Sequence, residues 1–304
     1  MMNQPNPIVS MKWLLARMYE PDLVIADCRF ALGKPESGRE AYEAAHVPGA
    51  VYLDLERDLS APVGEHGGRH PLPDPAELEA ALRRAGIGPD SRVVAYDDQG
   101  GAMASRLWWL LRWLGHDAVY VMDQGFSAWQ AAGYPVTDAT RVVVPGAFRA
   151  RVRPELLADV DAVRAASRTA EPEAWASAAG AGAESGSAAA ESAPLLIDSR
   201  EPRRYAGLEE PIDRAAGHIP GAVNRFWKGV LDKDGRWKSG DALSAALDGI
   251  PQDRELIVYC GSGVTACPNV LGLQAAGYGN VRLYAGSWSD WISYSENPVA
   301  TGKE

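Results

Sequence analysis

Residues 256–267, LIVYCGSGVTAC, carry the strongest local signal in this chain of 304 residues. Four apolar or aromatic residues predict a buried strand that ends on Cys260, and the glycines that follow predict a tight turn before a helix beginning near Val264. Such a turn can direct several backbone N–H groups, and the positive end of the helix dipole, toward the sulfur. Both effects favour a thiolate, and the same loop would stabilise a further, negatively charged sulfur atom carried on Cys260.

This strand belongs to a pattern that occurs twice in the chain. Several stretches of the first copy recur in the second copy. The number of residues that separates a stretch from its counterpart takes one of two nearly constant values. The pairs are Asp27–Arg29 with Asp198–Arg200, His46–Val51 with His218–Val223, Val93–Asp97 with Leu256–Cys260, and Trp129 with Trp291. Two homologous domains are therefore expected, with one length difference where the first copy carries residues 63–70, VGEHGGRH.

Short β-branched runs alternate with helical patterns in both copies. This alternation predicts an α/β fold with two tandem domains, each a mainly parallel sheet flanked by helices. The expected strands are Leu23–Asp27, Arg92–Asp97 and Ala118–Asp123 in the first copy and Leu195–Ser199, Leu256–Cys260 and Val281–Tyr284 in the second. Asp74, Pro75 and Gly86 further predict the N-cap, first position and stop of a helix.

We expect the first domain to span residues 1–140 and the second to span 154–304, with a linker over 141–153. A helix is expected over Glu155–Ala166. Residues 170–194 are rich in Ala, Gly and Ser and predict a flexible insertion inside the second domain, since such a segment buries little apolar surface.

Composition excludes several classes of protein. Hydrophobic residues make up 46% of the chain, enough for a packed core, and 30 Lys and Arg against 40 Asp and Glu give a net charge of −10, which disfavours binding to nucleic acid or anionic lipid. The longest apolar run, Leu107–Leu111, is far below the roughly 20 residues of a membrane span. The N-terminus has no signal-peptide pattern, and three cysteines are an odd, sparse set, so we expect a reducing, cytoplasmic setting.

Cys260 is the candidate nucleophile. Cys267 fits the inward face of the following helix, and Cys28 has a serine counterpart, Ser199, so both are expected to be packing residues. The repeat places Asp97 at the position of Cys260, and a carboxylate there is no soft nucleophile and would repel an anionic substrate. We therefore expect the first copy to be catalytically inert.

Three motifs carry a family resemblance: residues 217–222 (GHIPGA), 260–266 (CGSGVTA) and 284–288 (YAGSW). In this order, with an aspartate replacing cysteine in the first copy, they resemble the tandem rhodanese family of sulfurtransferases, most closely its 3-mercaptopyruvate sulfurtransferase branch. The resemblance implies that Cys260 takes sulfur from a small anionic donor, 3-mercaptopyruvate or thiosulfate, as a persulfide. It also implies transfer to a thiol, a thioredoxin-like protein or cyanide.

The resemblance implies the site residues as well. Ser262 matches the serine of a serine–histidine–acid relay, and Gly261, Gly263, Val264 and Thr265 complete the substrate-binding loop. The histidine of the relay matches His70, with His66 as the alternative. The acid would be Asp54 or Glu56, and the matching register gives Glu56, not the usual aspartate. A structural role for the histidine is an equal alternative.

Arg204 matches the carboxylate-binding arginine of the family, with Arg214 as a second candidate in a different register and Arg203 as a third. Members specialised for thiosulfate, a dianion, carry basic residues after the cysteine, whereas Gly261 and Ser262 are neutral. This favours a monoanionic donor whose carboxylate a guanidinium can hold. Thiosulfate remains the alternative donor.

Other chemistry fits less well. A cysteine phosphatase loop would need an arginine at the position of Ala266, and no nucleotide-binding or metal-ligand motif occurs, so we expect no cofactor and no metal. His46 and His218 precede Pro-Gly turns in both copies and are expected to be architectural. A non-catalytic sulfur carrier is the alternative from another functional class.

Overall fold

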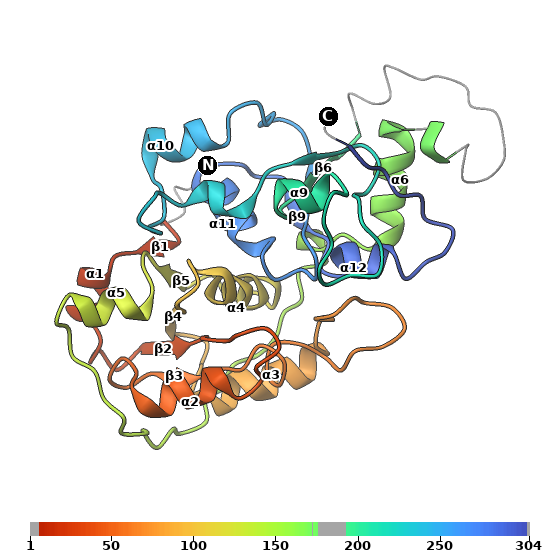
Figure 1. Ribbon diagram of the computed structural model, residues 1–304. Helices are drawn as coiled ribbons and strands as arrows, with labels where there is room; N and C mark the ends of the chain where they lie inside the picture. Colours follow the sequence, from red (N-terminus) through yellow and green to blue (C-terminus); the bar gives the residue numbers. More distant parts are fainter. Residues whose placement is uncertain (1–5, 172, 176–192, 303–304) are drawn as a thin grey trace. The chain divides into compact units, whose positions relative to one another are not determined.

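Contacts in the computed structural model, which describes residues 6–171, 173–175 and 193–302, divide the chain into two compact units (Figure 1). The first unit comprises Met1–Ala61, Pro73–Pro154 and Leu231–Ser239. The second comprises Pro62–Leu72, Glu155–Val230 and Gly240–Glu304. Each unit thus includes a short segment from the other half of the sequence, and the segment that contains His66 and His70 belongs to the second unit.

Within the described part of the first unit, five parallel strands form a sheet in the order β1-β5-β4-β2-β3. The strands are β1 Ile8–Val9, β2 Leu23–Asp27, β3 Val51–Tyr52, β4 Arg92–Tyr96 and β5 Val119–Met122. The helices are α1 Met11–Leu15, α2 Ser37–Ala44, α3 Pro75–Arg84, α4 Ala102–Trp113 and α5 Phe126–Ala131. The expected strands and the helix after Asp74 are confirmed, and β1 and β3 are too short to produce a sequence pattern.

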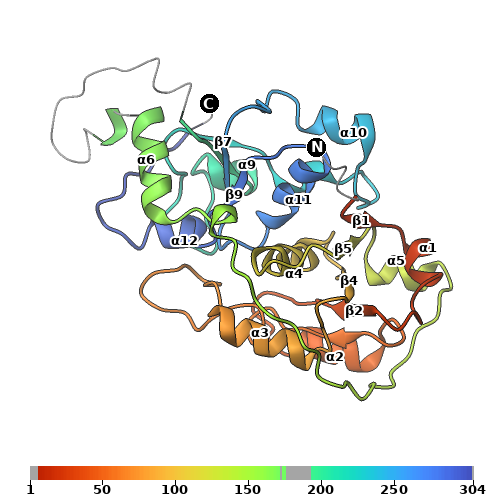
Figure 2. The same cartoon turned by 180° about the vertical axis from the view of Figure 1, so that it is seen from behind.

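The second unit repeats this arrangement with four parallel strands, in the order β7-β6-β8-β9, among its described residues. The strands are β6 Leu195–Asp198, β7 Ala222–Asn224, β8 Leu256–Tyr259 and β9 Val281–Leu283. The helices are α6 Val160–Ala170, α9 Pro202–Tyr205, α10 Gly240–Ala246, α11 Cys267–Ala275 and α12 Ser287–Trp291, with 3₁₀ turns at Pro154–Leu156 and Trp227–Val230. Figures 1 and 2 show α6 and α12 on one side of the strands and α10 and α11 on the other.

Apolar residues from the strands and helices pack together in each unit. In the first unit, Leu14, Tyr42 and Trp129 from three helices join Ile25 and Val94 from the sheet in one buried cluster. In the second, the corresponding cluster contains Val163, Tyr205 and Trp288 from the helices with Leu196 and Ile257 from the sheet. Helices thus cover apolar strands, as the α/β prediction requires.

Two histidines anchor equivalent loops in the two units. The ring of His218 is stacked on Tyr205, and its Nδ1 lies 2.8 Å from the carbonyl oxygen of that residue. His46 makes the same contacts with Tyr42, at 2.7 Å. The expected architectural role of both histidines is confirmed.

The helix expected over Glu155–Ala166 is wrong in its bounds. Leu157 bridges Leu283, and the N–H of Ala158 donates to the Leu283 carbonyl at 2.9 Å, so these residues extend the sheet edge. The helix α6 begins after Asp159, whose carboxylate accepts the N–H of Ala162. Most of the expected insertion at 170–194 lies outside the described residues. No helix in the described ranges is long and apolar enough to span a membrane.

Candidate active site

Strand β8 leads directly into Cys260, whose side chain is buried, and the loop 261–266 follows it. Three hydrogen bonds from the start of α12 hold the first two residues of this segment. The Ser287 Oγ accepts the N–H of Cys260, Trp288 N–H donates to the Cys260 carbonyl, and Ser289 N–H donates to the Gly261 carbonyl, each at 3.0 Å. The position of the cysteine therefore depends on a second loop, at residues 284–289.

Ser287 reaches this position through an unfavourable backbone conformation. Its φ of 57° is in the left-handed region, the one such non-glycine residue among those described. The hydroxyl also donates to the Tyr284 carbonyl at 2.9 Å, so its hydrogen bonds offset the conformational cost. Sequence reasoning did not identify Ser287 as a site residue, because its role depends on a contact with the loop that follows the neighbouring strand, β8.

The helix expected near Val264 begins later, at Cys267. The left-handed φ of +75° at Gly263 does not set this start, because Gly101 has a φ of +81° and directly precedes α4 in the first unit. Pro268 instead occupies the first turn of α11, where its missing N–H is tolerated. The N-terminus of the helix, with the positive end of its dipole, therefore lies several residues further along the chain from Cys260 than expected. Residues 261–266 form a longer loop than the sequence suggests.

That loop contains hydrogen-bond donors without protein partners. Among the described residues, no protein acceptor meets the backbone N–H groups of Gly261, Ser262, Val264, Thr265 and Ala266. All but Thr265 are buried, and a buried N–H without an acceptor is costly. A concave run of such donors is a site for an anion.

The first unit shows this loop with an anion in it. The carboxylate of Asp97 accepts four backbone N–H bonds of 2.8–3.0 Å, from Gln99, Gly101, Met103 and Ala104. Burial raises the pKa of Asp97, although these four bonds oppose the shift. In the first unit, the N–H groups of this loop therefore bind a carboxylate of the same loop, that of Asp97. In the second unit, Cys260 occupies the position of Asp97.

The segment 62–72 supplies the histidine. Gly67 N–H donates to Asp290 at 2.7 Å and Arg69 N–H donates to Ser289 at 3.1 Å, so the segment is fixed on α12. This brings His70 Nδ1 to 2.8 Å from the Ser262 Oγ, and both side chains are buried. His66 lies elsewhere in the unit, with its Nδ1 2.7 Å from Ser293 Oγ.

The two candidate acids lie in the first unit. The carboxylate of Asp54 accepts N–H bonds from Glu56 at 2.8 Å and from Arg57 at 2.9 Å, and the hydroxyl of Tyr52 at 3.2 Å. Asp54 therefore closes a local turn, and Glu56 is exposed. No cluster of His, Cys, Asp and Glu among the described residues could hold a metal ion.

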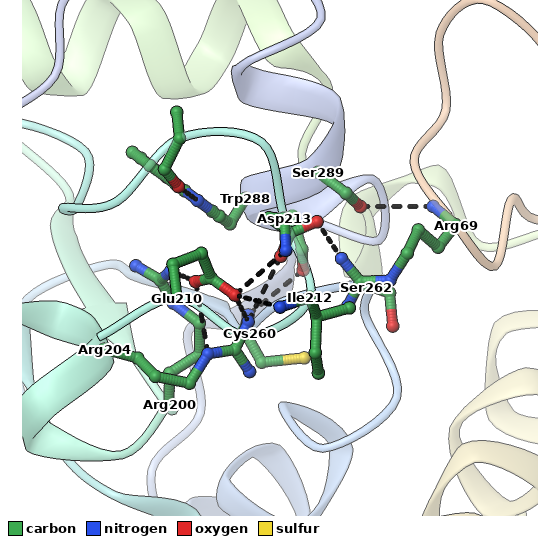
Figure 3. Close-up of polar contacts among 12 residues, drawn as sticks. Arg69, Arg200, Arg204, Glu210, Ile212, Asp213, Cys260, Ser262, Trp288 and Ser289 are labelled. Atoms are coloured by element: carbon green, nitrogen blue, oxygen red, sulfur yellow. Dashed lines mark hydrogen bonds and ion pairs between the residues drawn. The ribbon is translucent and has the colours of Figure 1, made fainter. Parts of the chain in front are cut away.

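Arg204 is positioned by a chain of ion pairs that begins at the sheet. Arg200, fully buried, is paired with Asp198 at the end of β6 at 2.6 Å. Glu210 accepts from Arg200 at 3.3 Å and from Arg204 at 2.6 Å (Figure 3). Burial opposes ionisation of Glu210, but the hydrogen bonds from Arg204 and from the backbone of Asp213 and Ile212, together with the charge of Arg204, lower the pKa of this carboxyl.

Arg69 is a site residue that sequence reasoning missed. A Cβ atom added to Gly261 would lie 2.9 Å from Arg69 Nη2 and 3.6 Å from Arg204 Nη2, so both guanidinium groups crowd the residue after Cys260. Arg214 instead donates to the carbonyl of Ile292, and Arg203 is a solvent-facing residue paired with Glu209. No sequence signal separates Arg69 from a surface arginine, because its contacts are with residues far along the chain.

Comparison with known proteins now identifies the family. The model of the rhodanese-like domain matches residues 10–132 and 183–294, the two copies of the repeat. The chain belongs to the rhodanese family. The cysteine loop at residues 260–266 lies in the second match, and Asp97 lies at the equivalent point of the first.

Rhodanese relatives of both donor types resemble the whole chain. The "Probable 3-mercaptopyruvate sulfurtransferase" of Pseudomonas aeruginosa is 46% identical over 97% of this chain and 98% of that protein. The "Thiosulfate sulfurtransferase" of Mus musculus is 32% identical over 97% of this chain and 96% of its own. The crystal structure of SseA, a 3-mercaptopyruvate sulfotransferase from Escherichia coli, superposes with a TM-score of 0.75 at 30% identity, covering 94% of this chain and all of that one.

Proposed function

We propose that this rhodanese is a sulfurtransferase that moves sulfur from 3-mercaptopyruvate through a persulfide on Cys260 to a thiol or cyanide. The observation that carries the proposal is the loop 261–266, in which the buried N–H groups of Gly261, Ser262, Val264 and Ala266 meet no protein acceptor among the described residues. The equivalent loop of the first unit holds the Asp97 carboxylate. A thiolate or a persulfide on Cys260 supplies the missing negative charge.

In the first half-reaction, the Cys260 thiolate attacks the donor sulfur and forms an S–S bond. The C–S bond breaks, and its electron pair moves into the donor as an enolate. The methylene carbon then takes a proton, giving pyruvate, while the donor's thiol proton leaves the sulfur, so that protons balance. In the second half-reaction the acceptor takes the outer sulfur and the Cys260 thiolate is restored.

His70 and Ser262 support the proton step of this scheme. The 2.8 Å contact between Nδ1 and Oγ allows a proton to pass from the ring to the hydroxyl and onward. The hydroxyl is two residues from Cys260, on the loop where the C–S bond would break. Arg204, held by Glu210, can bind the donor carboxylate.

The choice of donor follows from charge. Gly261 and Ser262 add no positive charge to the loop, and the two guanidinium groups near Gly261 are already paired with Asp213 and Glu210, which suits a monoanion better than a dianion. Thiosulfate is the second candidate, because relatives with that name match the whole chain.

Mass spectrometry of the peptide with residue 260, after treatment with 3-mercaptopyruvate, tests the function. We expect a gain of one sulfur atom in the wild type and in Cys267→Ser, a matched variant that removes the other buried thiol of this unit, but none in Cys260→Ser. An unmodified wild type would refute the proposal. A side-by-side assay with cyanide as acceptor tests the donor, and an equal or higher kcat/KM for thiosulfate would contradict the assignment.

A further inference from the structure

Two guanidinium groups in the second unit share one carboxylate beside the cysteine loop (Figure 3). Arg69 Nη1 donates to one oxygen of Asp213, and Arg204 Nη2 donates to the other oxygen at 3.2 Å. The Asp213 side chain is only 4% exposed, and both guanidinium groups are also close to Gly261. A carboxylate thus already bridges the two cations next to Cys260.

Glu210 and Asp213, the two acidic residues that contact Arg204, have different roles. Glu210 binds Arg204 through both Nε and Nη2, and it accepts the backbone N–H groups of Ile212 and Asp213, so it fixes the arginine and the adjoining turn. The side chain of Asp213 bonds only to guanidinium groups among the described residues. It can therefore rotate away without breaking the turn that Glu210 holds.

The N–H groups of the two guanidinium groups are incompletely paired in this arrangement. Arg69 Nε is buried and has no hydrogen-bond partner among the described residues, so Asp213 engages that guanidinium from one nitrogen only. Arg204 Nη1 likewise donates to no described protein group. A carboxylate that approached both arginines from the cysteine side would find vacant N–H donors.

Charge disfavours the addition of a fourth carboxylate, that of the sulfur donor, to this cluster. Arg69, Arg200 and Arg204 are matched in number by Asp198, Glu210 and Asp213, so the cluster is neutral as it stands. An anionic donor beside Asp213 would meet a like charge at short range. If Asp213 rotates out, two guanidinium groups become available to the donor.

We propose that Arg69 and Arg204 together bind the donor carboxylate and that Asp213 occupies its place in the free enzyme, to be displaced when the donor binds. This rests on the proposed function, since it assumes an α-keto carboxylate as donor. Arg69 becomes the second carboxylate-binding arginine, in place of Arg214, and Asp213 an internal competitor that sets donor affinity.

Steady-state kinetics with 3-mercaptopyruvate, together with calorimetric binding of pyruvate, test the proposal. Asp213→Asn keeps the side-chain shape but weakens the competitor, so we expect KM for the donor and Kd for pyruvate to fall at least threefold, with kcat within twofold. Glu210→Gln removes the same charge from the same cluster but loosens Arg204, so KM and Kd should rise. Opposite signs for these two variants separate displacement from a general effect of charge.

Arg69→Ala should raise both constants at least tenfold, and more than Arg214→Ala does. Arg69→Lys retains the charge and distinguishes loss of the guanidinium hydrogen-bond geometry from loss of the fold. Thermal melts of each variant check the fold directly. Unchanged or raised KM and Kd in a folded Asp213→Asn, or a larger loss in Arg214→Ala than in Arg69→Ala, would overturn the inference while sulfur loading of Cys260 still supports the function. A wild type that binds pyruvate but gains no sulfur would overturn the function alone.

Discussion

Gly263→Ala is predicted to destabilise the second unit and abolish sulfur loading of Cys260. The left-handed φ of +75° costs an alanine about 1–2 kcal/mol, partly offset by about 0.4–1 kcal/mol from a more restricted unfolded chain. The new Cβ would also overlap the carbonyl oxygen of Ala285 and lie 2.9 Å from its carbonyl carbon. Overpacking against backbone adds about 1–3 kcal/mol, so we expect a total loss of about 1–5 kcal/mol.

The clash also has a chemical consequence. Ala285 is two residues before Ser287, whose Oγ accepts the N–H of Cys260, so any shift of that backbone moves the cysteine. Gly277→Ala is the matched control, because Gly277 has a φ of +92° but nothing within 4 Å of an added Cβ. It should lose about 1 kcal/mol and keep its activity.

Urea denaturation gives the free energy of unfolding of both variants, and mass spectrometry of the peptide with residue 260 reports sulfur loading. If Gly263→Ala were no less stable than Gly277→Ala and accepted sulfur at the wild-type rate, the role assigned to the contact with Ala285 would be refuted.

Further predictions concern the relay and the dependence on pH. His70→Ala and Ser262→Ala should each lower kcat for 3-mercaptopyruvate by about 10²–10⁴-fold, but lower kcat for thiosulfate much less, because sulfite leaves without needing a proton on carbon; equal losses with both donors in parallel assays would argue for a structural role. Burial lowers the pKa of His218, although its bond to Tyr205 opposes the shift. The unfolded chain therefore takes up a proton first as the pH falls through about 6.5, and stability declines from there toward the lower pKa of the folded state. His218→Asn should reduce this slope, by at most about 1.4 kcal/mol per pH unit, in urea titrations between pH 7.5 and 5; an unaltered slope would contradict it.

The sequence predicted the sheets well, because their strands are buried runs whose pattern does not depend on distant residues. Leu23–Asp27 has the bounds expected of it, and β8 ends one residue before Cys260 as the glycine-rich turn requires. Helix starts were less certain. The start of α11 was misplaced because Pro268, which has no N–H, is tolerated only in the first turn of that helix.

The residues of the candidate site were likewise predicted only in part. The internal repeat and the family resemblance indicated Cys260, Ser262 and His70, and the structure brings the last two within hydrogen-bond distance. Arg69 and Asp213 were not predicted, since their importance comes from tertiary contacts between residues 144 positions apart. Charged residues in loops have the same local signature whether they face solvent or another loop.

The Asp97 loop has a consequence for the catalytic cycle. The first copy carries its counter-charge as part of its own sequence, so its loop is complete from the moment it folds. Among the described residues of the second copy, no side chain accepts the N–H groups of Gly261, Ser262, Val264, Thr265 and Ala266, and under the proposed function the sulfur on Cys260 takes that part. Under the proposed function, catalysis and local order are then coupled. Each transfer of sulfur to an acceptor returns Cys260 to a smaller anion, and the N–H groups of the loop are best satisfied while Cys260 carries the persulfide.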